Sequence, residues 1–142
     1  MATTTTIYTN KDTYLQERRS TTNDGSATTF RVGTTYTFGT HYKHNAILSF
    51  DVSGITDPAT ITEANLELQH VSSTGSTTQT VTLARLNEDF VEGQADWVES
   101  RDALSWTGGA GAFGNAETTQ PTYTFTVGSG VSSGFTIDIK EL

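Results

Sequence analysis

The sequence predicts an all-β fold, a jelly-roll-like antiparallel β-sandwich of seven to eight strands in a single domain spanning residues 1–142. Three observations predict it. Apolar residues recur at every second position in several short segments, the composition is rich in β-branched threonine, and clusters of Gly, Ser, Asn and Asp separate the segments. Short strands at this spacing are typical of sandwiches and barrels. A chain of 142 residues is long enough to bury one core.

The alternating segments give the expected strands in chain order. Early candidates lie around Ile7, at 14–15 and at 30–32. In 45–52, four apolar residues share one face, and Ile47 is the exception on the other face. The later candidates are 61–71, 81–85, 122–127 and 135–140. No stretch of helical period runs past two turns, so no long helix is expected.

The outward faces of these strands carry threonine rather than lysine or glutamate. Edge strands that lack Lys and Pro pair readily with a neighbouring chain. We therefore expect self-association, or packing against neighbouring subunits of an assembly.

Charge and composition exclude several classes of partner. The net charge of −8 at pH 7 disfavours nucleic acid, whose phosphates are bound by Lys and Arg, and also disfavours an anionic membrane surface. No apolar run approaches the roughly 20 residues of a membrane-spanning helix. The absence of cysteine excludes disulfides and thiolate chemistry. The first residues lack the features of a secretory signal, so we expect either assembly in the cytoplasm or a mature piece of a longer protein.

One long segment, 87–115, breaks the alternation. It contains both tryptophans, Trp97 and Trp106, and the glycine-rich run 107–114. It also contains six carboxylates, which are Glu88, Asp89, Glu92, Asp96, Glu99 and Asp102. A long irregular segment in a small domain either serves a function or packs on its own aromatic residues. We favour packing, with both tryptophans covering the core.

Several pieces of the sequence occur in an order that is characteristic of a known family. They are 12–15, 23–25, 30–33, 48–55, 61–68, 90–93, Trp97, and Trp106 followed by Gly108 and Gly109. In this order the chain resembles the DNRLRE domain family, a group of β-sandwich modules related to carbohydrate-binding modules. The resemblance implies a β-sandwich, and it makes carbohydrate binding one of the functions to be tested.

Two features depart from the family pattern. His44 and Asn45 stand where the family usually has an arginine before the strand 48–51. The family also continues well past a strand such as 135–139, whereas this sequence ends at Leu142. Three explanations stay open: the fold closes early, the sequence is part of a longer protein, or a neighbouring subunit supplies the missing strands by strand addition.

The acidic residues of 87–115 are the best candidates for a metal site. Calcium takes six to eight oxygen ligands from carboxylates and carbonyls on loops. The candidate ligands are Glu88, Asp89, Glu92 and Asp96, with Asn87 beside them. Calcium is the one cofactor considered, although a solvated acidic loop is the favoured interpretation.

The histidines are weaker candidates for a metal site. Zinc needs three or four convergent ligands, and a loop beside a strand does not bring residues three apart together as a helix would. We therefore expect His41 and His44 to be solvated loop residues, with His70 distant from them in the sequence.

The sequence shows no arrangement typical of catalysis. It has no Gly-x-Ser-x-Gly elbow, and the glycine-rich run 107–114 lacks the Lys-Ser/Thr of a P-loop. We expect that the protein is not an enzyme. Aromatic rings can stack on the faces of sugars, and the aromatic residues in expected loops are Trp97, Trp106, Tyr36, Tyr42 and Phe113. Of these, Tyr36 and Tyr42 are the candidate contacts to a ligand or partner.

Two classes of function fit these observations. The first is a structural virion protein, a capsid decoration (cement) or tail-fibre component of a bacteriophage, assembled in the host cytoplasm and bound to neighbouring capsid or tail subunits. The second is a carbohydrate-binding module or cell-surface adhesive domain of a larger secreted protein, with glycans as the partner. We favour the first, by analogy from fold and context.

Overall fold

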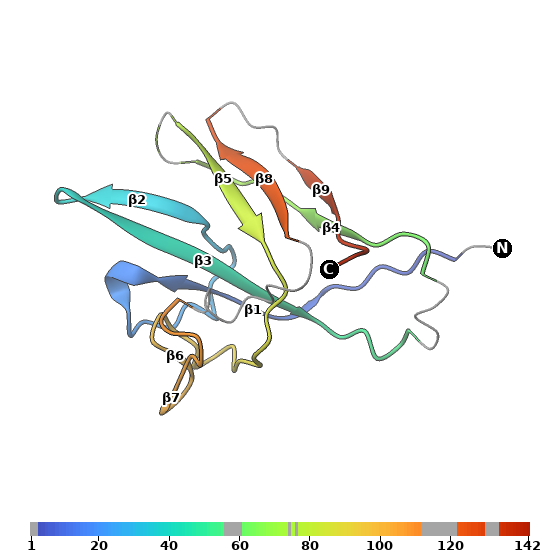
Figure 1. Ribbon diagram of the computed structural model, residues 1–142, viewed down its shortest axis with the longest axis horizontal. Coiled ribbons are helices and arrows are strands. Elements are labelled where there is room, and N and C mark those ends of the chain that lie inside the picture. Colours follow the sequence, from blue (N-terminus) through green and yellow to red (C-terminus); the bar gives the residue numbers. More distant parts are fainter. Residues whose placement is uncertain (1–2, 56–60, 74, 76, 112–121, 130–133) are drawn as a thin grey trace. The chain divides into compact units, whose positions relative to one another are not determined.

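Figure 1 shows the computed structural model of the chain, in which residues 3–55, 61–73, 75, 77–111, 122–129 and 134–142 are described. The chain divides into two compact units: unit 1 comprises Met1–Thr56 and Glu88–Asn115, and unit 2 comprises Asp57–Asn87 and Ala116–Leu142. The elements of unit 1 are β1 (Thr9–Gln16), the 3-10 helix η1 (Glu17–Arg19), β2 (Gly33–Thr37), β3 (Thr40–Phe50), β6 (Glu99–Arg101) and β7 (Leu104–Ser105). The elements of unit 2 are β4 (Asn65–Leu68), β5 (Thr78–Leu83), β8 (Tyr123–Gly128) and β9 (Phe135–Asp138).

The sheet of unit 1 is antiparallel, with the long strand β3 in the centre and the order β1-β3-β2. Leu15 of β1 lies opposite Asn45 of β3, and Tyr36 of β2 lies opposite His41 of β3. The second half of β1 is buried at every position, and Leu15 is 0% exposed. Because successive side chains of a strand point to opposite faces, this end of β1 is covered on both faces.

The segment 88–111 of unit 1 contains the short antiparallel pair β6 and β7 and packs around its own residues. Phe90, Ala95, Ser100 and Trp106 are all buried. The indole N–H of Trp106 donates a hydrogen bond to the backbone oxygen of Asp96 at 2.9 Å, so its polar atom is satisfied inside the core. The expectation that this segment packs on its own aromatic residues is confirmed for Trp106.

Unit 2 consists of two antiparallel ladders, β4 with β9 and β5 with β8. The rings of Phe125 in β8 and Phe135 in β9 lie 5.3 Å apart, and this contact joins the two ladders. His70 meets the same Phe135 ring edge-on at 6.3 Å. Phe125, Phe135 and His70 therefore form one aromatic cluster in unit 2.

The predicted fold class is confirmed: the described residues are all-β and their strands pair antiparallel. The described part has nine strands rather than seven or eight, because β6 and β7 have three and two residues and are too short to show alternation. The strand predicted at 30–32 lies instead at Gly33–Thr37, and the first strand begins at Thr9 rather than around Ile7. Within β3, Ile47 is the buried apolar residue, although the alternation treated it as the exception.

Within the described part of the chain, no helix is long and apolar enough to cross a membrane. The prediction of a single domain spanning 1–142 stays a prediction.

Candidate functional site

A pocket of about 240 Å³ lies on one face of β3 in unit 1. It is lined by Lys43 and Asn45 from β3 and by Trp97 and Ala110 from the segment 88–111. Lys43 and Asn45 are two positions apart on a strand, so both side chains project from the same face. We call this site the β3 pocket.

Asp96 fixes the turn that carries Trp97. One oxygen of its side chain, Oδ1, accepts hydrogen bonds from the backbone N–H groups of Val98 and Glu99, at 2.7 and 2.8 Å. The Asp96 N–H in turn donates to the backbone oxygen of Glu99 at 2.9 Å. A short aspartate side chain that binds the backbone N–H groups just after it is the standard way of closing such a turn. The turn leaves Trp97 half-buried, with its side chain lining the pocket.

Gly111 joins Trp97 to Asn45. Its N–H donates to the backbone oxygen of Trp97 at 2.6 Å, and its own oxygen accepts from the Asn45 side-chain amide, Nδ2, at 2.8 Å. A Cβ atom at this position would lie 2.9 Å from two atoms of the Trp97 ring, and the backbone φ is +85°. Only glycine adopts this conformation and this approach without strain. The position of the indole therefore depends on Gly111.

Lys43 and Asn45 supply the polar groups of the β3 pocket. The backbone N–H of Lys43 donates to Glu17 Oε2 at 2.8 Å, which ties β3 to η1. The Lys43 side chain is exposed, and within the described residues its ammonium group has no hydrogen-bond partner. Asn45 donates a hydrogen bond from Nδ2 to the backbone oxygen of Gly111. Within the described residues, its Oδ1 acceptor has no hydrogen-bond partner. The site thus combines an aromatic ring with one cationic donor and one amide acceptor.

Comparison with known families identifies the chain. Residues 3–133 match the model of carbohydrate-binding module family 96. The chain belongs to this family. Searches of curated proteins and of solved structures gave no match. The resemblance found in the sequence is therefore confirmed as a likeness to carbohydrate-binding modules.

Within this family 96 module, the four predicted calcium ligands are not gathered into one cluster. Glu88 accepts hydrogen bonds from the Ser100 hydroxyl at 3.1 Å and from the Thr107 N–H at 3.0 Å. Glu92 Oε1 accepts from the backbone N–H of Asp12 at 2.9 Å, and Asp96 closes the turn before Trp97. Each of these carboxylates holds a different piece of unit 1 together.

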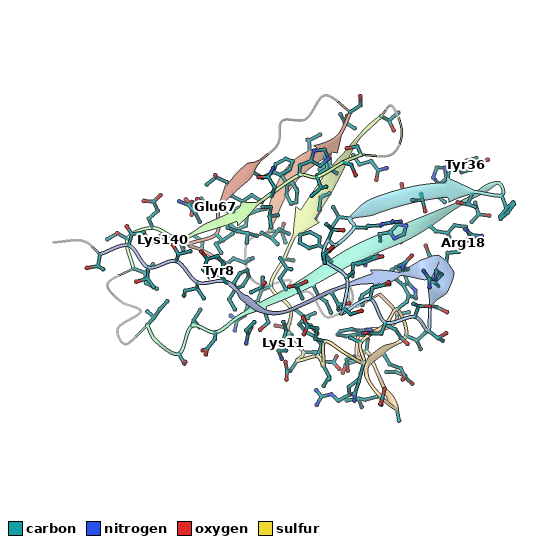
Figure 2. All side chains as sticks on the ribbon, turned by 180° about the vertical axis from the view of Figure 1, so that it is seen from behind. Tyr8, Lys11, Arg18, Tyr36, Glu67 and Lys140 are labelled. Atoms are coloured by element: carbon teal, nitrogen blue, oxygen red, sulfur yellow. The ribbon has the colours of Figure 1, made fainter. Side chains whose placement is uncertain are left out.

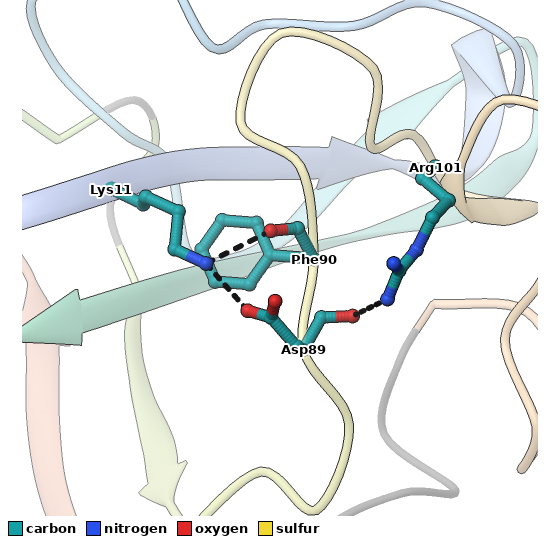
Figure 3. A network of polar contacts seen from close by, with 4 residues as sticks. All are labelled: Lys11, Asp89, Phe90 and Arg101. Atoms are coloured by element: carbon teal, nitrogen blue, oxygen red, sulfur yellow. Dashed lines mark hydrogen bonds and ion pairs between the residues drawn. The ribbon is translucent and has the colours of Figure 1, made fainter.

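The fourth predicted ligand, Asp89, takes part in the network drawn in Figure 3. Lys11 forms an ion pair with the Asp89 carboxylate and donates to the backbone oxygen of Phe90 at 3.1 Å. Its ammonium group also lies 5.0 Å from the centre of the Phe90 ring. Arg101 donates to the backbone oxygen of Asp89 at 3.2 Å. The hydrogen bond from Lys11 lowers the pKa of Asp89, and the network ties β1 to the segment 88–111.

Among the described residues, no group of three or more His, Asp or Glu side chains could hold a metal ion. Burial alone would raise the pKa of Glu88, but the hydrogen bonds from Thr107 and Ser100 outweigh it and the pKa is lowered. Glu88 and Asp89 are thus charged groups with partners inside the protein. The calcium site stays a prediction from the sequence.

The two histidines that were expected in a solvated loop belong instead to a strand. His41 and His44 belong to β3, and because they are three positions apart they project from opposite faces. His41 is exposed, whereas His44 is 7% exposed and its Nε2 lies 3.0 Å from the Thr35 hydroxyl. His70 Nε2 lies 2.8 Å from the Ser73 hydroxyl in unit 2.

The two candidate tyrosines belong to β2 and β3 but lie on opposite faces of this hairpin. Tyr36 is 67% exposed, and its ring lies 4.8 Å from the ring of its cross-strand partner His41, on the face of the β3 pocket. Tyr42 points to the other face, where the Arg18 guanidinium lies 6.0 Å from its ring. Figure 2 labels Tyr36 and Arg18 at this end of the hairpin. Phe113 lies outside the described residues.

Sequence reasoning missed Lys43 as a site residue and favoured a core role for Trp97 over sugar stacking. Lys43 stands between His41 and His44 in the sequence, and no motif marked it as a contact to a ligand. The alternation along β3 contained a usable signal, since it places Lys43 and Asn45 on one face. The approach of Trp97 to that face depends on the loop through Gly111, and the glycine-rich run 107–114 did not show which residues that loop would contact.

Proposed function

We propose that this module binds carbohydrate at the β3 pocket. The observation that carries the proposal is the half-buried indole of Trp97 beside the ammonium group of Lys43 and the amide of Asn45, around one cavity. An indole offers a flat apolar face on which the C–H face of a sugar ring can stack. Charged and amide groups at its edge form hydrogen bonds with the sugar hydroxyls. These bonds replace the hydrogen bonds to water that the hydroxyls lose on binding.

The size of the pocket fits this role. Pockets that enclose drug-sized ligands are typically ~300–1,000 Å³. At about 240 Å³, the β3 pocket is smaller and suits a single sugar ring. Trp97 is also held rigidly by the turn at Asp96 and by Gly111, so little ordering is needed when a ligand binds.

The binding is proposed to occur without hydrolysis. Glycosidases use two carboxyl groups that flank the scissile bond. The described lining of the β3 pocket consists of an amine, an amide, an indole and a methyl group, none of which replaces that pair. Membership in a family of carbohydrate-binding modules supports the same conclusion.

Family membership favours carbohydrate binding over the structural virion role that the sequence first suggested. The DNRLRE assignment, the virion or cell-surface location and the self-association of the chain stay predictions. A virion role and glycan binding are compatible, and the binding experiment below tests the glycan function directly.

The test is binding of the full chain to a panel of immobilised polysaccharides. The panel contains neutral β-glucan, mannan, chitin and uronic-acid polymers, and binding is measured by retention in affinity gels and by calorimetry. We expect at least one polymer to retain the chain, and Trp97→Ala and Lys43→Ala to weaken that binding about tenfold, from the loss of stacking and of a charged hydrogen bond.

Phe38→Ala is the matched control, because it also removes an exposed aromatic ring from unit 1 but does so away from the pocket lining. Lys43→Ala tests the site even if Trp97→Ala fails to fold, because the Lys43 side chain is exposed and its removal should not disturb folding. Retention of no polymer would reject the proposed function. Full affinity in both pocket variants would reject this site.

A further inference from the structure

A row of side chains leads from the β3 pocket to the tip of the β2–β3 hairpin. His41, Lys43 and Asn45 are alternate residues of β3, and no register shift interrupts their pairing with β1 and β2. They therefore share one face of the strand. Tyr36 joins the row from β2, because it is paired directly with His41.

The row is longer than the pocket. A strand advances by about 3.4 Å per residue, so the four steps from Asn45 to His41 cover about 14 Å. That span exceeds one sugar ring. The pocket holds only the Asn45 end of the row, and the His41 end lies on the open surface of the hairpin.

The far end of the row presents an aromatic platform. The rings of Tyr36 and His41 lie 4.8 Å apart at 47°, and Tyr36 is 67% exposed. A large aromatic side chain this exposed is not explained by the core of unit 1. Its position is fixed by the turn that follows: Phe38 and Gly39 have φ of 51° and 82° and connect the last pair, Thr37 and Thr40. Two residues of positive φ make the tight turn that suits the twist of a hairpin and sets its register.

We propose that Tyr36 and His41 form a second sugar subsite, so that the module binds an oligosaccharide chain laid along β3 rather than a single terminal sugar. The inference rests on the proposed function of the β3 pocket. One sugar unit stacks on Trp97, the following part of the chain passes over Lys43, and a further unit stacks on Tyr36 with the His41 imidazole beside it. The exposed Lys43 side chain, between the two aromatic ends, can hydrogen-bond the hydroxyls of the connecting part.

The experiment is a length series. Oligosaccharides from disaccharide to hexasaccharide, prepared from each of the four polymer classes of the panel, are titrated into the full chain by calorimetry. We expect the affinity of the wild-type chain to rise with length. In Tyr36→Ala, the affinity for the hexasaccharide should fall roughly three- to tenfold, as expected for one lost stacking contact, while the affinity for the disaccharide stays unchanged.

Two further variants separate a subsite from a structural role. Tyr36→Phe keeps the ring and should keep most of the length dependence, whereas Tyr8→Ala removes another exposed tyrosine, which lies outside the row, and should leave the length dependence intact. Length-independent affinity of the wild-type chain would overturn the proposal, as would an equal loss for short and long ligands in Tyr36→Ala. Length-independent binding that still requires Trp97 would leave the proposed function standing, whereas no binding at any length would reject both.

Discussion

Gly111 and Trp97 are in direct contact: the glycine N–H is hydrogen-bonded to the tryptophan oxygen at 2.6 Å, and the position of its missing Cβ lies 2.9 Å from the indole ring. The same glycine accepts a hydrogen bond from the Asn45 amide. One residue without a side chain therefore sets both an aromatic and a polar component of the β3 pocket.

Substitution of Gly111 is expected to disturb the pocket. Gly111→Ala adds a methyl group against the indole at a backbone φ of +85°, so both crowding and backbone strain oppose it. We expect a loss of about 2–3 kcal/mol in the free energy of unfolding and a shift of the Trp97 fluorescence. Urea unfolding and emission spectra measure these effects.

Gly109→Ala is a matched control for this prediction. Gly109 has a similar φ of +96°, but a Cβ there would have no atom within 4 Å. Gly109→Ala should lose only about 1 kcal/mol in the free energy of unfolding, because of the strain of a left-handed backbone, and it should keep the glycan affinity of the wild type. Equal losses in the two variants would show that the contact with Trp97 adds nothing.

Gly25 is expected to be the least replaceable glycine in the contact between the segment 23–25 and the segment 88–111. A Cβ at Gly25 would lie 2.1 Å from the backbone oxygen of Glu92. The neighbouring Asn23 amide also donates to that oxygen, at 2.6 Å, and to the oxygen of Ala95, at 2.7 Å. Gly25→Ala must therefore push two hydrogen-bonded segments apart, with an expected loss of about 3 kcal/mol.

The control for Gly25 is Gly93→Ala, at a position where a Cβ would meet nothing within 4 Å. We expect this variant to unfold within about 0.5 kcal/mol of the wild-type chain in urea. A Gly25→Ala protein as stable as the wild type would mean that the two segments separate at little cost.

The sequence predicted the fold class because alternation is a local signal. The strands β3, β5, β8 and β9 each contain residues whose alternate side chains are apolar, and each was found close to its expected place. β2 was misplaced since Gly33–Thr37 is mostly threonine and has no apolar alternation to mark it. Its pairing with β3 comes from the hairpin turn at Phe38 and Gly39, and a phenylalanine of positive φ is not a recognisable turn residue.

The site was less predictable than the fold because its parts are distant in the sequence. Tyr36 and Tyr42 were expected together in loops, whereas they belong to the paired strands β2 and β3 and project from opposite faces. The carboxylates of 88–96 were interpreted as a solvated acidic loop, with calcium ligands as the alternative, whereas Glu88, Asp89 and Asp96 have backbone or side-chain partners inside unit 1. Sequence shows the charge of a side chain but not the N–H groups that the fold brings to it.

Asp96 is expected to contribute to stability rather than to metal binding. Asp96→Ala removes an acceptor from the N–H groups of Val98 and Glu99, with an expected loss of about 1–2 kcal/mol, as for other lost capping side chains. Asp96→Asn keeps a side-chain oxygen and should recover most of that loss. Thermal unfolding measures both variants, with the exposed Asp102→Ala as the control. A rise in melting temperature on addition of calcium to the wild type but not to Asp96→Asn would instead favour the calcium prediction.

His44 is expected to make the chain less stable in mild acid. Burial lowers the pKa of His44, and the positive charge of Arg31 adds to this, while Asp24 and Glu17 act in the opposite direction. The folded state therefore binds the proton less readily than the unfolded state, in which histidine has a pKa of about 6.5. The free energy of unfolding should be greatest above that pH and should fall as the pH is lowered through the folded-state pKa.

Urea unfolding of the wild-type chain between neutral pH and mild acid measures this fall. His44→Gln removes the titrating group and keeps a side chain that can bond to the Thr35 hydroxyl, so the fall between neutrality and mild acid should become smaller. His41→Gln, on the exposed side of the same strand, should leave it unchanged. The buried Nδ1 of His44 has no hydrogen-bond partner among the described residues, so protonation there would place a charged donor in a site that offers it no acceptor. If His44→Gln and His41→Gln reduced the fall equally, the acid sensitivity would arise elsewhere in the chain.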